Sequence, residues 1–324
     1  MSNPLQMVDL AGLGINSTDT VIQVPRFPAF NSKLEFISSE VMLGGQVASA
    51  LAACSRWGLR CRYIGSIGDD AFGQLQKDAM ACEQVEAHWI VTPSCQSQST
   101  FILVEESSGE RTILWKRDPR LAIPPQRIDT RWILQSKALH VDGHDCPAAA
   151  AAAKLARGSR IPVIADLDNL YPGVEALLKN VDYAISSQEF PARLTGENDL
   201  FVSLPRIASR FGSRIAAATL GDDGVLAWDG TEFHYHPAFE VKARDTTGAG
   251  DIFHAAFAYG MLRGWTLQHQ LEFSSAAAGL ACTGLGARGG IATIAQIEEL
   301  VRTGRRRPAL FSKVQLEAAK ATTP

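Results

Sequence analysis

The feature that most constrains the fold of this chain is a repeated alternation of short apolar segments with longer segments of helical periodicity. Strand-like runs occur at 6–13, 61–64, 138–141, 163–165, 183–185 and 215–220, and helix-like segments lie near 45–57, 71–82, 146–157, 172–179, 188–194 and 199–211. Strands that are separated by helices pair in parallel, with the helices covering the sheet. We therefore predict one α/β domain over 1–324, in three α/β/α layers around a mostly parallel sheet.

Two regions depart from this alternation. Residues 20–43 contain extended pieces at 20–24 and 34–42, and residues 99–115 have the pattern of a hairpin with a turn at Ser107-Ser108-Gly109. Four such strands can pair into a small sheet that projects from the main body. We expect this small sheet to act as a lid over the carboxyl ends of the parallel strands, where open α/β sheets bind ligands.

The composition excludes several classes of protein. With 31 basic and 34 acidic side chains the formal charge is −3, so no basic excess is present to bind nucleic acid. No apolar run approaches the roughly 20 residues of a membrane span, and the start has no signal-peptide pattern. Six cysteines form no C-x-x-C pair, which favours reduced thiols. We expect a cytoplasmic protein without membrane or nucleic-acid partners.

The segment Asp245-Thr246-Thr247-Gly248-Ala249-Gly250-Asp251 carries the strongest chemical signal, because it leads directly into an apolar helix. Glycines at a helix start leave backbone N–H groups unobstructed, and the helix dipole favours an anion there. A carboxylate at Asp251 would stand within reach of a nucleophile that attacks the bound anion. This arrangement suits phosphoryl transfer, in which an acidic residue accepts the proton of the acceptor hydroxyl. The alternative is a plain helix cap after a glycine turn.

Two further glycine turns support a phosphate-binding protein. Thr219, Gly221 and Gly224 lie in a tight turn that follows a predicted strand and precedes another short one, and Gly44-Gly45 precede a predicted helix. Each alone is a common structural feature. By contrast, Gly12-Leu13-Gly14 lacks the third glycine and the helix of a dinucleotide-binding fingerprint, and no P-loop, zincin or hydrolase motif occurs.

The segments GGQVASALAACSRWGLRCRYIGSIGDDAFG (44–73) and DTTGAGDIFHAAFAYGM (245–261) resemble the two signatures of the PfkB, or ribokinase-like, carbohydrate kinases. The resemblance spans nearly the whole chain and is closer to the ribokinase and ketohexokinase-like branch. It implies a ribokinase-like fold with a β-sheet lid. It also implies transfer of the γ-phosphate of ATP, with Mg²⁺, to a sugar hydroxyl, for example a primary CH₂OH of a pentose or ketohexose.

The resemblance also implies roles for individual residues. Asp251 corresponds to the catalytic base, and Gly248, Ala249 and Gly250 to the anion hole around the γ-phosphate. The expected nucleotide-binding residues are Ser187, Thr219, Gly221, Gly224, Gly248, Gly250, Ser275, Gly279 and Gly286. The expected acceptor-binding residues are Asn16, Asp19, Gly44, Gly45 and Ser49, to which the residue pattern adds Lys33 and His144, the latter equally suited to a structural hydrogen bond. The candidate magnesium residues are Asp166 and Glu189, acting through water, and a monovalent cation such as K⁺ would use Asp245 and Thr247.

Three positions differ from the family pattern. Ser49 stands where many members have an asparagine that contacts the sugar, and Ser187-Gln188-Glu189-Phe190 replaces the usual N-x-x-E motif, which organises magnesium. Gly290 stands where a serine often helps to bind the monovalent cation. The carboxylate that holds magnesium and a requirement for potassium therefore stay open.

Alternatives to a neutral sugar also stay open. A nucleoside would need an aromatic stacking surface, which Phe101 or Trp115 can supply. A sugar phosphate or sugar acid would need a basic residue near the flap, such as Lys33. A non-catalytic sugar-binding protein on the same fold is the alternative from another class. The resemblance further allows a homodimer that forms through the edge strands of the lid.

Overall fold

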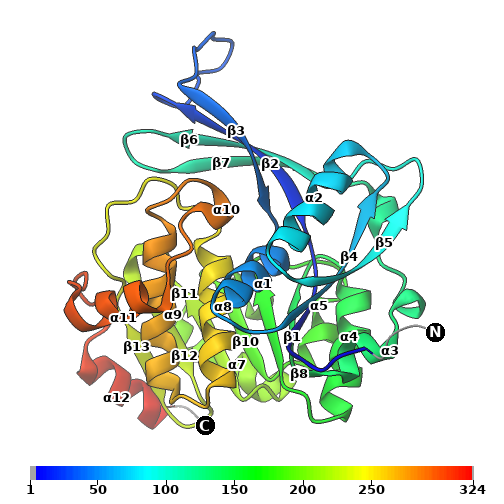
Figure 1. Cartoon of the computed structure of the whole chain (residues 1–324). Helices are drawn as coiled ribbons and strands as arrows, with labels where there is room; N and C mark the ends of the chain where they lie inside the picture. The colour runs from blue at the N-terminus through cyan, green and yellow to red at the C-terminus, as the bar shows by residue number, and fades with distance from the viewer. Residues whose placement is uncertain (1–4, 323–324) are drawn as a thin grey trace.

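The main body of the protein is built on a nine-stranded sheet (Figure 1). The structure is a computed structural model that describes residues 5–322. From one edge of the sheet to the other the strands are β13 (Phe233–His236), β12 (Val225–Trp228), β11 (Ile215–Thr219), β10 (Tyr183–Ser187), β9 (Val163–Leu167), β8 (Ser136–Asp142), β1 (Val8–Leu13), β4 (Cys61–Gly68) and β5 (Glu86–Thr92). All pairs from β11 to β5 are parallel, and the pairs β11–β12 and β12–β13 are antiparallel, so that β12 alone is reversed in this sheet of the described residues.

Helices cover both faces of this sheet and bury two separate apolar clusters. One cluster is formed with α1 (Gln46–Arg56), α8 (Ala249–Leu262) and α9 (Leu267–Ala281), and the other with α4 (Cys146–Gly158), α5 (Val174–Leu178) and α7 (Leu200–Phe211). The remaining helices are α2 (Ala71–Cys82), α3 (Thr130–Leu134), α6 (Phe190–Thr195), α10 (Gly286–Gly289), α11 (Ile294–Thr303) and α12 (Lys313–Thr322). The predicted three-layer α/β fold is therefore confirmed.

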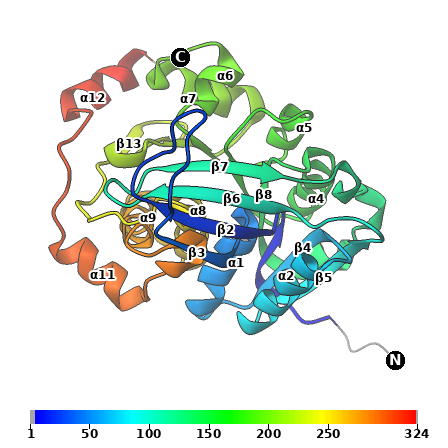
Figure 2. The same cartoon turned by 90° about the horizontal axis from the view of Figure 1, so that it is seen from above.

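A second sheet of four strands lies over the end of the main body (Figures 1 and 2). Its order is β3 (Ser38–Gly44), β2 (Ser17–Val24), β6 (Ser99–Glu105) and β7 (Arg111–Lys116). The two hairpins join through the parallel pair β2–β6. The sequence predicted all four of these strands from the two regions that break the βα alternation.

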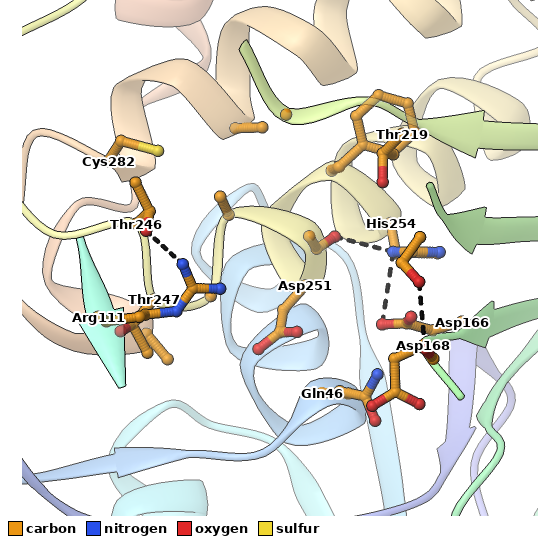
Figure 3. Close-up of a pocket in the computed structure, with 18 of the residues that line it drawn as sticks. Gln46, Arg111, Asp166, Asp168, Thr219, Thr246, Thr247, Asp251, His254 and Cys282 are labelled. Carbon is orange, nitrogen blue, oxygen red and sulfur yellow. Dashed lines mark hydrogen bonds and ion pairs between the residues drawn. The ribbon is translucent and has the colours of Figure 1, made fainter. Parts of the chain in front are cut away.

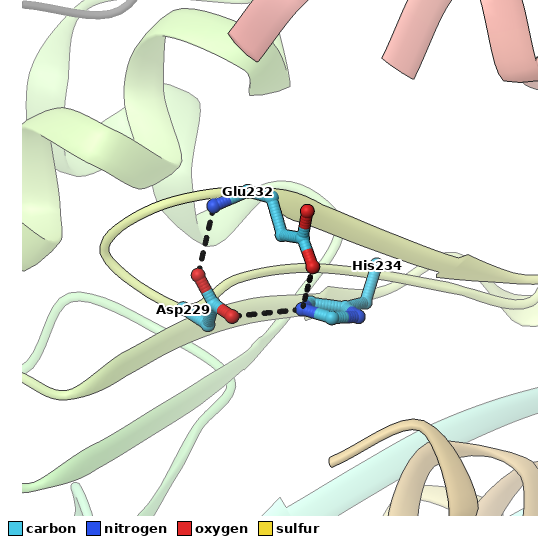
Figure 4. Close-up of side chains that lie close together, drawn as sticks. All are labelled: Asp229, Glu232 and His234. Atoms are coloured by element: carbon cyan, nitrogen blue, oxygen red, sulfur yellow. Dashed lines mark hydrogen bonds and ion pairs between the residues drawn. The ribbon is translucent and has the colours of Figure 1, made fainter. Parts of the chain in front are cut away.

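The strands that the sequence did not predict lie at the edges of the main sheet. β5 and β13 each have only one neighbouring strand, and most of their side chains are half-buried. Such strands need no continuous apolar run, so their pattern is weak. The turn before β13 is held by Asp229, whose Oδ1 accepts the N–H groups of Thr231 and Glu232 at 2.8 Å and whose Oδ2 lies 2.9 Å from Nε2 of His234 (Figure 4).

Within residues 5–322, no helix combines the length and apolar character that crossing a bilayer requires.

Candidate active site

A pocket of about 660 Å³ opens between the two sheets, at the carboxyl ends of β9, β10 and β11 (Figure 3). Its wall combines the start of α8, the ends of these strands, one side of α9 and the inner face of the small sheet. The position agrees with the general rule for ligand sites in open parallel sheets.

The start of α8 forms one wall of the pocket because Gly248 allows the backbone to turn sharply there. Gly248 is the N-cap, with φ of 77°, and a Cβ at this position would lie 2.6 Å from Cα of Ala287. Only glycine accommodates both the left-handed conformation and this close approach. Ala249, Gly250 and Asp251 then form the first turn and line the pocket, where first-turn N–H groups lack partners within the helix. The resulting wall is suited to an anion.

The carboxyl group of Asp251 projects from this first turn into the pocket (Figure 3). Desolvation in the pocket wall raises the pKa of Asp251 to about 8, and the neighbouring carboxyl of Asp166 also raises it, whereas His254 and Arg111 oppose the shift. A carboxyl group that titrates near neutrality is a competent proton acceptor. Asp251 therefore has both the position and the basicity of a general base.

Two more carboxyl groups lie at the end of β9. Asp166 and Asp168 both line the pocket, and burial raises the pKa of each, followed for Asp166 by repulsion from Asp168. Asp166 Oδ2 lies 3.4 Å from Nδ1 of His254, which also contacts the carbonyl oxygen of Gly250 at 2.8 Å. Two carboxylates in one pocket wall are an oxygen donor set that fits Mg²⁺.

Glu189, the other magnesium candidate, lies elsewhere. Its side chain is exposed at the surface, outside the residues that line the pocket, and it forms an ion pair with Arg193 one helical turn away. Ser187, which precedes it, does line the pocket and donates a hydrogen bond to the carbonyl oxygen of Asp168 at 3.1 Å. The pocket thus brings Asp168, rather than Glu189, beside Asp166.

Most of the residues predicted to bind the nucleotide meet along one side of the pocket: Ser187, Thr219, Gly221, Gly224, Ser275 and Gly279. Gly286 lies just behind the wall, next to the pocket-lining Ala287. The N–H of Gly286 donates to Oδ2 of Asp245 at 2.7 Å, and the N–H of Thr247 donates to Oδ1 at 2.8 Å. Buried Asp245 thereby fixes the loop before α8 against α10.

Asp19 belongs to β2 of the small sheet and lines the pocket from there. Its Oδ1 accepts a hydrogen bond from Oγ of Ser17 at 2.6 Å, and burial raises its pKa. A Cβ at Gly44 would lie 1.9 Å from Oδ2 of Asp19, and one at Gly45, where φ is 93°, would lie 2.6 Å from Cα of Asn16. The glycine pair is therefore required by the close approach of β2 and β3.

The structure separates the other predicted acceptor residues into three environments. Both amide atoms of Asn16 are buried without a hydrogen-bond partner among residues 5–322, as is Oγ of Ser49, and neither residue lines the pocket. Lys33 is exposed in the segment before β3, also outside the pocket wall. His144 lines the pocket, where its Nε2 lies 3.1 Å from the hydroxyl of Tyr171.

Several pocket residues were not predicted from the sequence: Gln46, Arg111, Asp168 and Tyr171. Trp115 was named only for a nucleoside acceptor. The sequence did carry a signal for Arg111 and Trp115. Together with Ile113 they alternate along β7 and so share one face of the sheet. Asp168 and Tyr171 follow β9 in a loop, and no periodicity indicates their direction.

Comparison with known proteins agrees with this geometry. The family described as pfkB carbohydrate kinases matches residues 9–294, most of the chain. The protein belongs to this family. It is thus a sugar kinase, a phosphotransferase that acts on a hydroxyl group, and the non-catalytic alternative is not favoured.

Relatives and solved structures cover nearly the whole length of this kinase. It is 28% identical over 287 residues to an ATP-dependent ribose-1-phosphate kinase from Halopiger xanaduensis, covering 87% of this chain and 94% of that protein. It is 24% identical to a ribokinase from Bacillus subtilis, covering 91% and 100%. A ribokinase structure from Thermotoga maritima superposes with a TM-score of 0.79 at 24% identity, covering 91% and 100%, which supports the fold.

Proposed function

We propose that this kinase transfers the γ-phosphate of ATP to a hydroxyl of a neutral sugar, such as the primary CH₂OH of a pentose or ketohexose, with Asp251 as the base. The observation that carries the proposal is that Asp251, the first-turn amides of α8 and Asp19 all face one pocket. An anion site, a base and a polar acceptor site are the parts that phosphoryl transfer needs.

ATP as the donor is supported by the relatives. The Halopiger relative is named as ATP-dependent, and an Arabidopsis thaliana ribokinase that shares the fold was solved with ribose and ATP. Thr219, Gly221 and Gly224 would lie along its phosphates, and Ser275 and Gly279 beside its base. Mg²⁺ supplies charge neutralisation on the phosphates, and Asp166 and Asp168 would hold it, directly or through water. Removal of divalent ions with EDTA should abolish turnover, and added Mg²⁺ should restore it.

The chemical step uses the groups already in place. Asp251 accepts the proton of the acceptor hydroxyl while the oxygen of that hydroxyl forms a bond to the γ-phosphorus. The bond from the γ-phosphorus to the bridging oxygen breaks, and this oxygen leaves with ADP. The amides of Gly248, Ala249 and Gly250 stabilise the charge on the transferring group, an effect worth about 3–4 kcal/mol per key donor in other enzymes.

The charge of the acceptor end favours a neutral acceptor. Asp19 lines it together with the proposed base Asp251, and among the residues that the structure describes the cationic side chains in the pocket wall are Arg111 and Arg307. Arg307 pairs with Asp222 at 2.9 Å, on the nucleotide side. Because a phosphate or carboxylate on the acceptor would meet these carboxyl groups, a sugar phosphate or sugar acid fits poorly. A nucleoside is the second candidate, since Trp115 and Tyr171 offer aromatic surfaces.

A coupled ADP-release screen tests the acceptor class. The panel contains pentoses, ketohexoses, ribose-1-phosphate, sugar acids and nucleosides, with the product identified by mass spectrometry. We expect the highest kcat/KM for a neutral pentose or ketohexose. A preference for ribose-1-phosphate or a sugar acid would overturn the neutral-acceptor proposal, and a preference for nucleosides would select the second candidate.

A monovalent cation near α10 would use the loop of Asp245 and Thr247. The Oγ1 of Thr247 is buried and has no hydrogen-bond partner in the described part of the chain, which supports a ligand there, whereas both carboxylate oxygens of Asp245 already accept backbone N–H groups. Turnover in KCl that exceeds turnover in LiCl at equal ionic strength would support K⁺ as an activator. Equal turnover would exclude it.

A homodimer through the small sheet is also part of the proposal. The outer face of this sheet carries Val41, Phe101 and Leu114, which are 57%, 51% and 58% exposed. A row of exposed apolar side chains on a sheet is typical of an interaction surface. Light scattering should give twice the mass of the 35.0 kDa chain, and the double variant Phe101→Glu, Leu114→Glu should give the monomer. A wild-type monomer would exclude this dimer.

A further inference from the structure

The small sheet contributes one arginine to the pocket. Along β7, Arg111, Ile113 and Trp115 line the pocket, whereas Thr112, Leu114 and Lys116 lie on the other face of the strand. Arg111 is the first residue of β7 and pairs in register with Val104 near the tip of the β6–β7 hairpin. The hairpin therefore places the positive charge of Arg111 between the small sheet and the main body.

The guanidinium of Arg111 lies beside the anion site. Nη1 of Arg111 donates a hydrogen bond to Oγ1 of Thr246, two residues before Gly248, and Figure 3 shows the guanidinium on the same side of the α8 start as Asp251. The charge of Arg111 also lowers the pKa of Asp251 against the dominant desolvation. The hairpin tip packs close to the same loop, since a Cβ at Gly109 would lie 3.1 Å from the carbonyl carbon of Arg244.

The bonding of Arg111 leaves most of its donors free for a ligand. Its hydrogen bond goes to a neutral hydroxyl. Within the described part of the chain, the carboxyl groups that form ion pairs do so with partners other than Arg111. The buried arginine of the main sheet, Arg62, by contrast makes two hydrogen bonds with Glu86 and three with backbone carbonyl oxygens. A guanidinium is planar and presents five N–H donors that match phosphate oxygens.

We propose that Arg111 is a catalytic residue that binds an oxygen of the transferring phosphoryl group. The proposal rests on ATP as the donor in the function proposed above. As the acceptor oxygen bonds to the γ-phosphorus and the bridging oxygen departs with ADP, Arg111 keeps its protons and neutralises charge on the equatorial oxygens. Asp251 receives the hydroxyl proton. Because the small sheet carries Arg111, this charge is in place only while the sheet lies over the pocket, as it does here.

The test compares Arg111→Ala with Lys116→Ala, which removes a cation from the opposite face of the same strand. We expect Arg111→Ala to lower kcat by on the order of 10²–10³-fold, since one donor to the transition state has this weight. The KM of the acceptor should change by less than about threefold, because the arginine acts at the donor end. Lys116→Ala should keep kcat within about twofold of the wild type.

Chemical rescue distinguishes a catalytic role from a structural one. Guanidinium chloride at low millimolar concentration should raise the kcat of Arg111→Ala at least tenfold, and should leave Lys116→Ala unchanged. Arg111→Lys should retain intermediate activity, because it keeps the charge and loses the forked geometry. A kcat for Arg111→Ala within threefold of the wild type would overturn the proposal, as would a loss that guanidinium does not relieve in both Arg111→Ala and Arg111→Gln.

The same experiment separates this proposal from the proposed function. If the wild type releases no ADP with any acceptor, the choice of ATP as donor fails. If the wild type turns over and the Arg111 variants behave like it, only the role of Arg111 fails.

Discussion

The two ends of the pocket are built from different parts of the chain. The donor end consists of backbone amides and small residues in short sequence segments, with the first turn of α8 and the turn after β11 at its centre. The acceptor end consists of large or charged side chains, Asp19, Trp115, His144, Asp168 and Tyr171, which come from both sheets.

This difference follows from what each end binds. A phosphate chain is chemically the same in every ATP, so a helix start and two glycine turns suffice to recognise it. An acceptor differs from one kinase to another, and side chains that converge from distant segments can be exchanged one at a time. Changes at the donor end should therefore affect the KM of ATP or kcat for every acceptor, whereas changes at the acceptor end should affect one acceptor class.

The largest effect is expected where the two ends meet, at Asp251. Asp251→Asn keeps the shape of the side chain and removes its capacity to accept a proton, so kcat should fall by on the order of 10³-fold or more. The KM of ATP should change little, because the amides of the first turn are backbone groups. ADP release measures kcat, and calorimetry measures binding of a non-hydrolysable ATP analogue. Near-normal turnover in Asp251→Asn would show that another group is the base.

The pH dependence of kcat/KM tests the environment of the same residue. The pKa of Asp251 is raised from 3.8 to about 8, and the base is active only as the carboxylate. Activity should consequently fall as the pH decreases below about 8, approaching about tenfold per unit, which amounts to about 50-fold from pH 8 to pH 6. An acidic limb near pH 4 would contradict the desolvated environment that the structure gives this carboxyl group.

The same contrast explains what the sequence could predict. Gly248 to Asp251 and the turn from Thr219 to Gly224 are local patterns, and they line the pocket as expected. Asp19 was also found, because the family resemblance implies an acceptor-binding residue at this position after the first predicted strand. Lys33 was placed near the acceptor on its charge alone, and it lies at the surface instead. Side chains in loops carry no periodicity, which is why Asp168 and Tyr171 were not predicted.

A smaller effect is expected from Gly248→Val at the donor end. The variant must adopt φ near 77° with a Cβ 2.6 Å from Cα of Ala287, so the first turn of α8 has to shift. A displacement of this kind costs on the order of 10- to 100-fold in kcat/KM for ATP, equally for all acceptors. Gly158→Ala is the control, since a Cβ there meets no atom within 4 Å. An effect that depends on the acceptor would contradict the division of the pocket.

The smallest effect is expected from Trp115→Ala at the acceptor end. Trp115 is 55% exposed and lies edge-on to the ring of His144, with 6.0 Å between centroids, so its removal should not open the core. Loss of one aromatic contact of about 1 kcal/mol should raise the KM of the acceptor by about fivefold and leave the KM of ATP unchanged. Thr112→Ala, on the opposite face of β7, is the control and should change neither constant.

If the effect of Trp115→Ala is much larger for nucleosides than for free sugars, the aromatic surface serves a base rather than a sugar ring. If instead the KM of ATP rises as much as that of the acceptor, Trp115 does not belong to the acceptor end alone.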